Sequence, residues 1–198
     1  MNDKVNAIYN AAEHTDGIIR TSEIEKLGIG RYNLSNLVEQ GVLVRESHGI
    51  YSVSNEHPDE YYLIQVRSDK LLFSYGTALF LHGLSDRVPN IIDVTLPQGY
   101  NASRLKKSNK SIRVHYVRPE YLEYEVEELE TPQGYKVKVY SRERCICELI
   151  KKPNSVDKQI YTQAIKQFFN ELKSPRKLLN AAKSFDVEEQ VRKYMEVL

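Results

Sequence analysis

In the first 55 residues, stretches with hydrophobic residues at helical spacing alternate with short extended stretches. Apolar residues at helical spacing predict a helix over residues 2–13, and a short extended stretch follows at 18–20. A second helix is predicted from Thr21 and Ser22 to Gly28, with Ser22 and Glu25 fitting a capping box.

A third helix and a hairpin complete this N-terminal part of the chain. Leu34, Leu37 and Val38 lie on one face of the predicted third helix, which Gly41 ends. Residues 42–45 and 50–53 flank a turn at Ser47-His48-Gly49 and predict a β-hairpin. Helix, strand, helix, short turn, helix and hairpin is the order of a winged helix-turn-helix.

The rest of the chain has a different pattern. The extended patterns predict strands at 91–96, 112–117 and 135–140, and a helix is predicted over 71–82. Apolar stripes at helical spacing then predict helices over 156–172, 175–185 and 187–198, with Ser174 as a cap and Pro175 at the first helical position. We therefore expect an α+β protein: an N-terminal winged helix-turn-helix (1–55), a polar linker EHPDE (56–60) and a mixed α+β domain ending in a C-terminal helical group (61–198).

Composition indicates a folded protein, with 41% hydrophobic and 28% charged residues and a net charge of +1. That balance gives no global argument for a nucleic-acid or membrane partner. The N-terminus has no apolar signal core and the longest apolar stretch is too short for a bilayer, so we expect a cytoplasmic protein. The two cysteines and five scattered histidines predict neither a disulfide framework nor a metal site.

The third helix carries the residues that favour DNA binding. Arginine and asparagine side chains reach guanine and adenine edges with two hydrogen bonds each. We expect bases to be read by the outward side chains Arg31, Tyr32, Asn33, Ser35 and Asn36. Phosphate or wing-side contacts are expected from Thr21, Ser22, Arg45 and His48.

Charge leaves an alternative open for this part of the chain. Residues 1–55 contain five basic and seven acidic side chains, a net charge of −2. A unit with few basic side chains neutralises few DNA phosphates and releases few of the counterions bound to them. Its non-specific affinity for DNA would therefore be weak. A protein-interaction module that does not bind DNA is therefore the second interpretation.

Charge is segregated in the C-terminal part. Residues 101–118 hold six cations and no acid, and residues 120–130 hold six acids and no cation. The basic run is either a solvated loop or a surface for DNA or another partner. Its candidate contact residues are Arg104, Lys106, Lys107, Lys110 and Arg113.

Enzyme motifs are missing from the sequence. It contains no Gly-rich phosphate loop of either common type and no GxSxG elbow. Asp93 with Glu171 and Lys173 is the best nuclease set, but these residues are far apart in the sequence and do not form a motif. We expect no enzymatic activity and no cofactor.

The order of several stretches resembles the AbiEi-type antitoxins of bacterial abortive-infection (type IV toxin–antitoxin) systems. The stretches are residues 21–53, SYGTALFLHGLSDRVPNIIDVTLP at 74–97, VYSRERCICELI at 139–150 with Glu143-Arg144, and the helical QAIKQFF and LLNAAKSF. The resemblance covers nearly the whole chain and places the recognition helix at 31–40 and the wing at 45–51.

This resemblance implies two roles. The winged helix would bind inverted repeats in the promoter and repress its own operon. The C-terminal domain would counter a nucleotidyltransferase-like toxin, without a stable complex, as part of phage resistance. A stand-alone transcriptional regulator is the alternative within the DNA-binding class.

Overall fold

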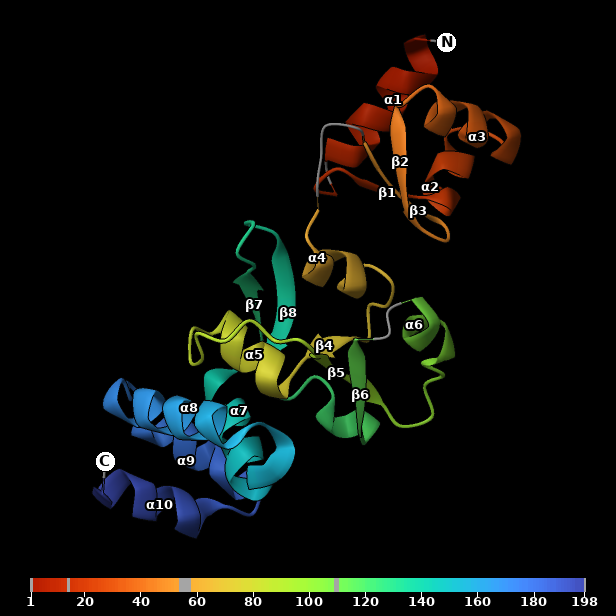
Figure 1. The fold of residues 1–198 in the computed structure, drawn as a ribbon. Helices are drawn as coiled ribbons and strands as arrows, with labels where there is room; N and C mark the ends of the chain where they lie inside the picture. The colour runs from red at the N-terminus through yellow and green to blue at the C-terminus, as the bar shows by residue number, and fades with distance from the viewer. Residues whose placement is uncertain (1, 14, 54–57, 109–110, 198) are drawn as a thin grey trace. The chain divides into compact units, whose positions relative to one another are not determined.

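The computed structural model describes residues 2–13, 15–53, 58–108 and 111–197. The chain forms two compact units: an N-terminal unit (Met1–Ile64 with Gln133–Tyr135) and a C-terminal unit (Gln65–Pro132 with Lys136–Leu198) (Figure 1). Residues 56 and 57 of the predicted linker lie outside the described residues, and Glu60 already begins a helix. The predicted boundary at 56–60 stays a prediction.

The N-terminal unit combines helices with a small antiparallel sheet. The sheet has the order β1-β3-β2, with Ile18 opposite Ser52 and Leu43 opposite Val53. In chain order the elements are α1 (Asn2–Glu13), β1 (Ile18–Arg20), α2 (Thr21–Lys26), α3 (Arg31–Glu39), β2 (Leu43–Ser47), β3 (Ile50–Val53) and α4 (Glu60–Gln65), which ends at the division between the units.

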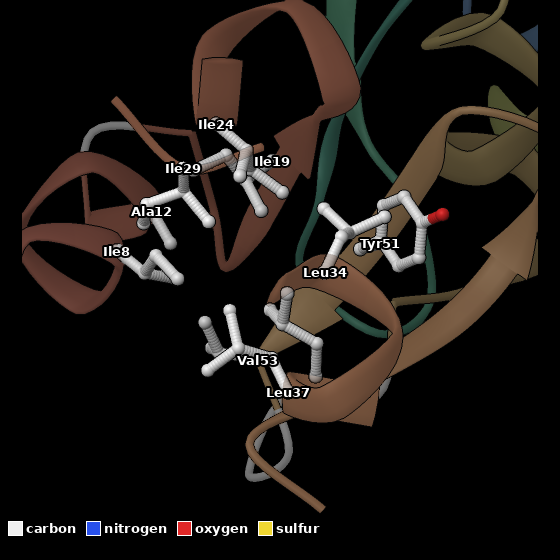
Figure 2. Close-up of a cluster of buried hydrophobic side chains, with 10 residues drawn as sticks. Ile8, Ala12, Ile19, Ile24, Ile29, Leu34, Leu37, Tyr51 and Val53 are labelled. Carbon is white, nitrogen blue, oxygen red and sulfur yellow. The ribbon is translucent and has the colours of Figure 1, made fainter. Parts of the chain in front are cut away.

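One buried cluster of apolar side chains holds α1, α2, α3 and the three strands together (Figure 2). Ile8 and Ala12 of α1 meet Ile24 of α2 and Leu37 of α3, as the helical spacing of these residues predicted. The start of α2 differs from the prediction. The helix begins at Thr21, and the Arg20 N–H donates to the Glu23 carboxylate at 2.7 Å.

The predicted Ser22–Glu25 capping box is therefore wrong. Ser22 already lies inside the first turn of α2, so its hydroxyl does not stand at the capping position.

The C-terminal unit contains a mixed five-stranded sheet in the order β6-β5-β4-β8-β7. Parallel pairs join β5 to β6 and β4 to β8, whereas β4–β5 and β7–β8 are antiparallel. The elements before the final helices are β4 (Leu72–Phe73), α5 (Tyr75–Leu81), β5 (Ile92–Pro97), α6 (Ser103–Ser108), β6 (Ile112–Val117), the 3₁₀ helix η1 (Pro119–Tyr121), β7 (Val126–Glu130) and β8 (Lys136–Tyr140).

Two predictions for this sheet need correction. The helix predicted over 71–82 is β4 followed by α5, because Leu72 and Phe73 form a central strand that is buried on both faces and so shows no alternation. The strand β7 has no counterpart among the predicted elements. Its residues VEELE are mostly acidic, and β8 supplies Lys138 opposite Glu128 and Lys136 opposite Glu130.

Four α-helices follow the sheet and gather into one group, drawn from cyan to dark blue in Figure 1. They are α7 (Arg142–Lys151), α8 (Lys158–Asn170), α9 (Pro175–Ser184) and α10 (Glu188–Val197), with the 3₁₀ helix η2 (Pro153–Ser155) after α7. The Ser174 hydroxyl accepts a hydrogen bond from the Lys177 N–H at 3.3 Å, so this predicted cap is confirmed. The described residues include no helix with the length and apolar character needed to cross a membrane. The α+β class is confirmed.

Arg144 of α7 lies at the centre of this unit and is fully buried. Its Nε donates to Glu148 at 2.9 Å, and its Nη1 donates to the carbonyl oxygens of Tyr121 and Tyr124. The guanidinium carbon lies 3.3 Å from the centroid of the Tyr140 ring. This one side chain therefore connects η1, β8 and α7.

Replacing Arg144 by methionine is expected to lower the free energy of unfolding of the C-terminal unit by about 3–5 kcal/mol. The substitution leaves Glu148 buried without its cation and two carbonyl oxygens without their donor. Urea unfolding of the full chain measures the loss. The double variant Arg144→Met/Glu148→Leu is expected to recover part of it. A loss below about 1 kcal/mol for Arg144→Met would contradict the central role of this ion pair.

Candidate nucleic-acid interface

A tight turn joins α2 to α3 and fixes the direction in which α3 starts. Gly28 has a φ of 74°, a left-handed conformation that favours glycine. The next residue, Ile29, is 1% exposed and donates its N–H to the Ile24 carbonyl at 3.3 Å. An apolar anchor thus holds the turn against α2 and positions the first residue of α3.

Helix α3 has a buried face and a polar face. Leu34 and Leu37 are 7% and 6% exposed and pack into the core of the unit. On the opposite side Tyr32 is 81% exposed, and Asn33 and Ser35 are also exposed. Asn36 is half-buried, and Arg31 is the first residue of α3. The helix therefore presents amide, hydroxyl and phenol groups on a rigid support.

The hairpin β2–β3 lies next to the start of α2. The Thr21 N–H donates to the Gly49 carbonyl at 3.0 Å, so this N–H is already used within the unit. Arg45 and His48 are exposed, on β2 and in the turn that follows it. Ser22 is exposed in the first turn of α2, whereas Thr21 is half-buried.

The predicted secondary contacts lie on the C-terminal unit. Arg104, Lys106 and Lys107 are exposed on α6, and Arg113 is exposed on β6. Lys110 lies outside the described residues. Several side chains of the acidic run at 120–130 already have basic partners within the chain. Lysines of β8 lie opposite Glu128 and Glu130, and Lys177 lies 3.7 Å from Glu125. The basic run on α6 is therefore the more available of the two charged surfaces.

A cluster that the sequence pattern did not predict lies at the β6 edge of the five-stranded sheet. Asp93 of β5 contacts His115 and Arg113 of β6, with His115 Nε2 at 2.7 Å from Asp93 Oδ1. Alternation along two predicted strands could have placed these side chains on one face. Their pairing depends on the parallel register of β5 and β6, which the sequence pattern does not give.

The other candidate groups for chemistry do not form a site. Among the described residues, no three His, Cys, Asp or Glu side chains are grouped closely enough to hold a metal ion. Cys145 and Cys147 are buried free thiols, and burial raises the pKa of Cys147 to about 12, which disfavours the reactive thiolate. Glu171 pairs with Arg142 at 2.7 Å, so Asp93 and Glu171 contact different partners.

Most of the N-terminal unit is similar to a known protein family. Residues 6–54 match a family described as a transcriptional regulator, AbiEi antitoxin. The predicted resemblance to AbiEi-type antitoxins is confirmed there. The match covers α1 to β3 and includes the polar face of α3.

One solved structure supports the fold over nearly the whole chain. The crystal structure of the RV2827C protein from Mycobacterium tuberculosis is similar with a TM-score of 0.60, covering 96% of this chain and 79% of that one. The sequences are 12% identical, so the likeness concerns the fold alone. No curated protein sequence matches the chain.

Proposed function

We propose that this chain is a DNA-binding antitoxin that represses transcription through a winged helix-turn-helix in its N-terminal unit. The observation that carries the proposal is the polar outward face of α3 on a buried apolar support, within a segment similar to AbiEi transcriptional regulators. Such a helix meets the geometric requirement for reading base edges in the major groove.

Each part of the unit has a role in this proposal. Arg31, Tyr32 and Asn33 begin α3, which is the end of a recognition helix that contacts bases. Ser35 and Asn36 extend the same face. Contacts with the DNA backbone come from the start of α2 and from the wing, through Thr21, Ser22, Arg45 and His48.

The proposed antitoxin role also involves the C-terminal unit. Binding to inverted repeats in its own promoter represses the operon, and the C-terminal unit counters a nucleotidyltransferase-like toxin without a stable complex. Neither role requires catalysis or a cofactor in this chain. The site of action is the cytoplasm, and the biological setting is defence against phage.

One observation favours a second candidate function. The first 55 residues carry a net charge of −2, which weakens attraction to the DNA backbone. A protein-interaction module would tolerate this charge, and it would use the exposed Tyr32 as an apolar anchor. Co-purification of a toxin together with no binding to any duplex would support this alternative.

The direct test of the proposed function compares two duplexes. Binding of the full chain to its own upstream DNA and to a scrambled duplex of the same composition is measured by fluorescence anisotropy across a salt series. A preference of about a thousandfold for the upstream DNA is expected of a specific repressor. Equal, weak and salt-sensitive binding to both duplexes would contradict it.

Asn33→Ala is expected to weaken upstream DNA binding by about 1–3 kcal/mol while leaving binding to scrambled DNA unchanged, because a bidentate base contact is lost. The matched control is Asn10→Ala, an exposed asparagine on α1, which should bind like the unchanged chain. Unaltered upstream binding by the Asn33 variant would remove this residue from the site.

Lys106→Ala combined with Lys107→Ala tests the secondary surface on α6. If both lysines contact phosphates, the slope of log K against log salt becomes smaller in magnitude by about two, and all duplexes are weakened alike. Lys151→Ala with Lys152→Ala is the matched control, two adjacent exposed lysines at the end of α7. If the double variant has the same salt slope as the unchanged chain, the two lysines do not contact phosphates and the basic run is a solvated surface segment.

A further inference from the structure

The cluster at the edge of the C-terminal sheet contains one buried carboxylate and two partly exposed nitrogen-bearing side chains. The Asp93 side chain is 5% exposed, and its Oδ1 lies 2.7 Å from His115 Nε2 and 3.5 Å from Arg113 Nη1. The side chains of His115 and Arg113 are 24% and 46% exposed. The carboxylate is thus inside, and the two nitrogen-bearing side chains lie between it and solvent.

The parallel pairing of β5 and β6 creates this arrangement. Asp93 is opposite Arg113 and Thr95 is opposite His115, so all four side chains project from the same face of the sheet. Hydrogen bonds fix the backbone of Asp93 on both sides. Its N–H donates to the Thr77 hydroxyl at 2.8 Å, and its carbonyl accepts from the Ser74 N–H at 3.1 Å.

Space for the carboxylate depends on a glycine. A Cβ atom at Gly76 would lie 3.2 Å from Asp93 Oδ2, which is tighter than most real contacts. The preceding residue, Tyr75, has a φ of 44°, a conformation that a bulky residue seldom adopts. Its ring packs against the His115 imidazole at an interplanar angle of 36°, with the centroids 4.2 Å apart.

Two nitrogen-bearing side chains share one carboxylate in this cluster. Arg113 Nη1 and His115 Nε2 both contact Asp93 Oδ1, and the buried Glu148 adds an electrostatic interaction with His115. Among the residues that the structure describes, Asp93 is the acidic side chain that contacts the Arg113 guanidinium, and at 46% exposure the rest of that group can reach a ligand.

We propose that Arg113 and His115, positioned by Asp93, form a binding site for a phosphate group. Guanidinium N–H groups match phosphate oxygens in pairs, and an imidazolium Nδ1–H adds a third charge-assisted donor. Asp93 is a positioning residue that orients both donors and does not touch the ligand. The basic residues of α6, which packs beside β6, increase the local attraction for anions.

The phosphate belongs either to a nucleic-acid backbone or to a free phosphate compound, and the same donors serve both. The site stands independently of the proposed function, because the phosphate probe requires no operator and no contribution from α3. Failure of specific DNA binding and failure of this site are therefore separate results.

The test uses the full chain labelled with ¹⁵N and three probes: inorganic phosphate, adenosine monophosphate and a duplex of arbitrary sequence. Inorganic phosphate is expected to shift the His115 imidazole resonances saturably. Arg113→Gln and His115→Gln should each weaken phosphate binding at least about tenfold. Arg118→Gln makes the same change of charge just beyond β6 and should bind as the unchanged chain does.

Gly76→Ala tests the positioning role without removing a charged group. It should weaken phosphate binding about as much as Asp93→Asn, while thermal unfolding shows that both variants are folded. If Arg113→Gln also weakens duplex binding and inorganic phosphate competes with the duplex, the ligand is a nucleic-acid backbone. If adenosine monophosphate binds more tightly and the duplex is unaffected, it is a free phosphate compound.

The proposal is overturned if phosphate leaves His115 unshifted, or if Arg113→Gln, His115→Gln and Arg118→Gln bind phosphate alike. It is also overturned if folded Asp93→Asn and Gly76→Ala variants retain full affinity, because the buried carboxylate would then have no part in placing the donors.

Discussion

A guanidinium group with no exposed surface holds the C-terminal unit together. Placing the Arg144 charge in the interior costs several kcal/mol, and the structure offsets this cost with Glu148, two carbonyl oxygens and the face of Tyr140. The contacts come from η1, β8 and α7 itself, so the end of the sheet and the first helix of the C-terminal group must form together. Burial raises the pKa of Glu148 in spite of the opposing charge of Arg144.

A second buried charge, Asp93, contacts two partly exposed side chains, Arg113 and His115. The N-terminal unit works differently. Its elements are held by an apolar cluster that includes Leu34 and Leu37, while Tyr32, Asn33 and Ser35 of α3 are exposed. If the unit binds DNA as proposed, the net charge of −2 in its first 55 residues requires specific contacts from α3 to supply much of the affinity. Such binding would depend on sequence more than on general attraction to phosphates.

Sequence periodicity was a good guide wherever one face of an element is buried and the other is solvated. The helix at 2–13, the apolar face of α3, and the stripes of α8 and α10 all follow this rule. It failed at Leu72–Phe73, where a central strand is buried on both faces, and at β7, where cross-strand lysines rather than apolar alternation define the strand. The outward residues of α3 could be named from spacing. The Asp93 cluster could not, since strand order and parallel register arise from tertiary packing.

The central claim is that α3 and the wing of the N-terminal unit form the surface that meets DNA. The most direct measurement is the change in backbone amide resonances when ¹⁵N-labelled full chain is titrated with its upstream duplex. The account predicts that the largest changes fall in residues 31–36 and in the wing at 45–51, with the buried strand β1 little affected. Changes confined to residues 104–118, with α3 unperturbed at saturating duplex, would contradict it.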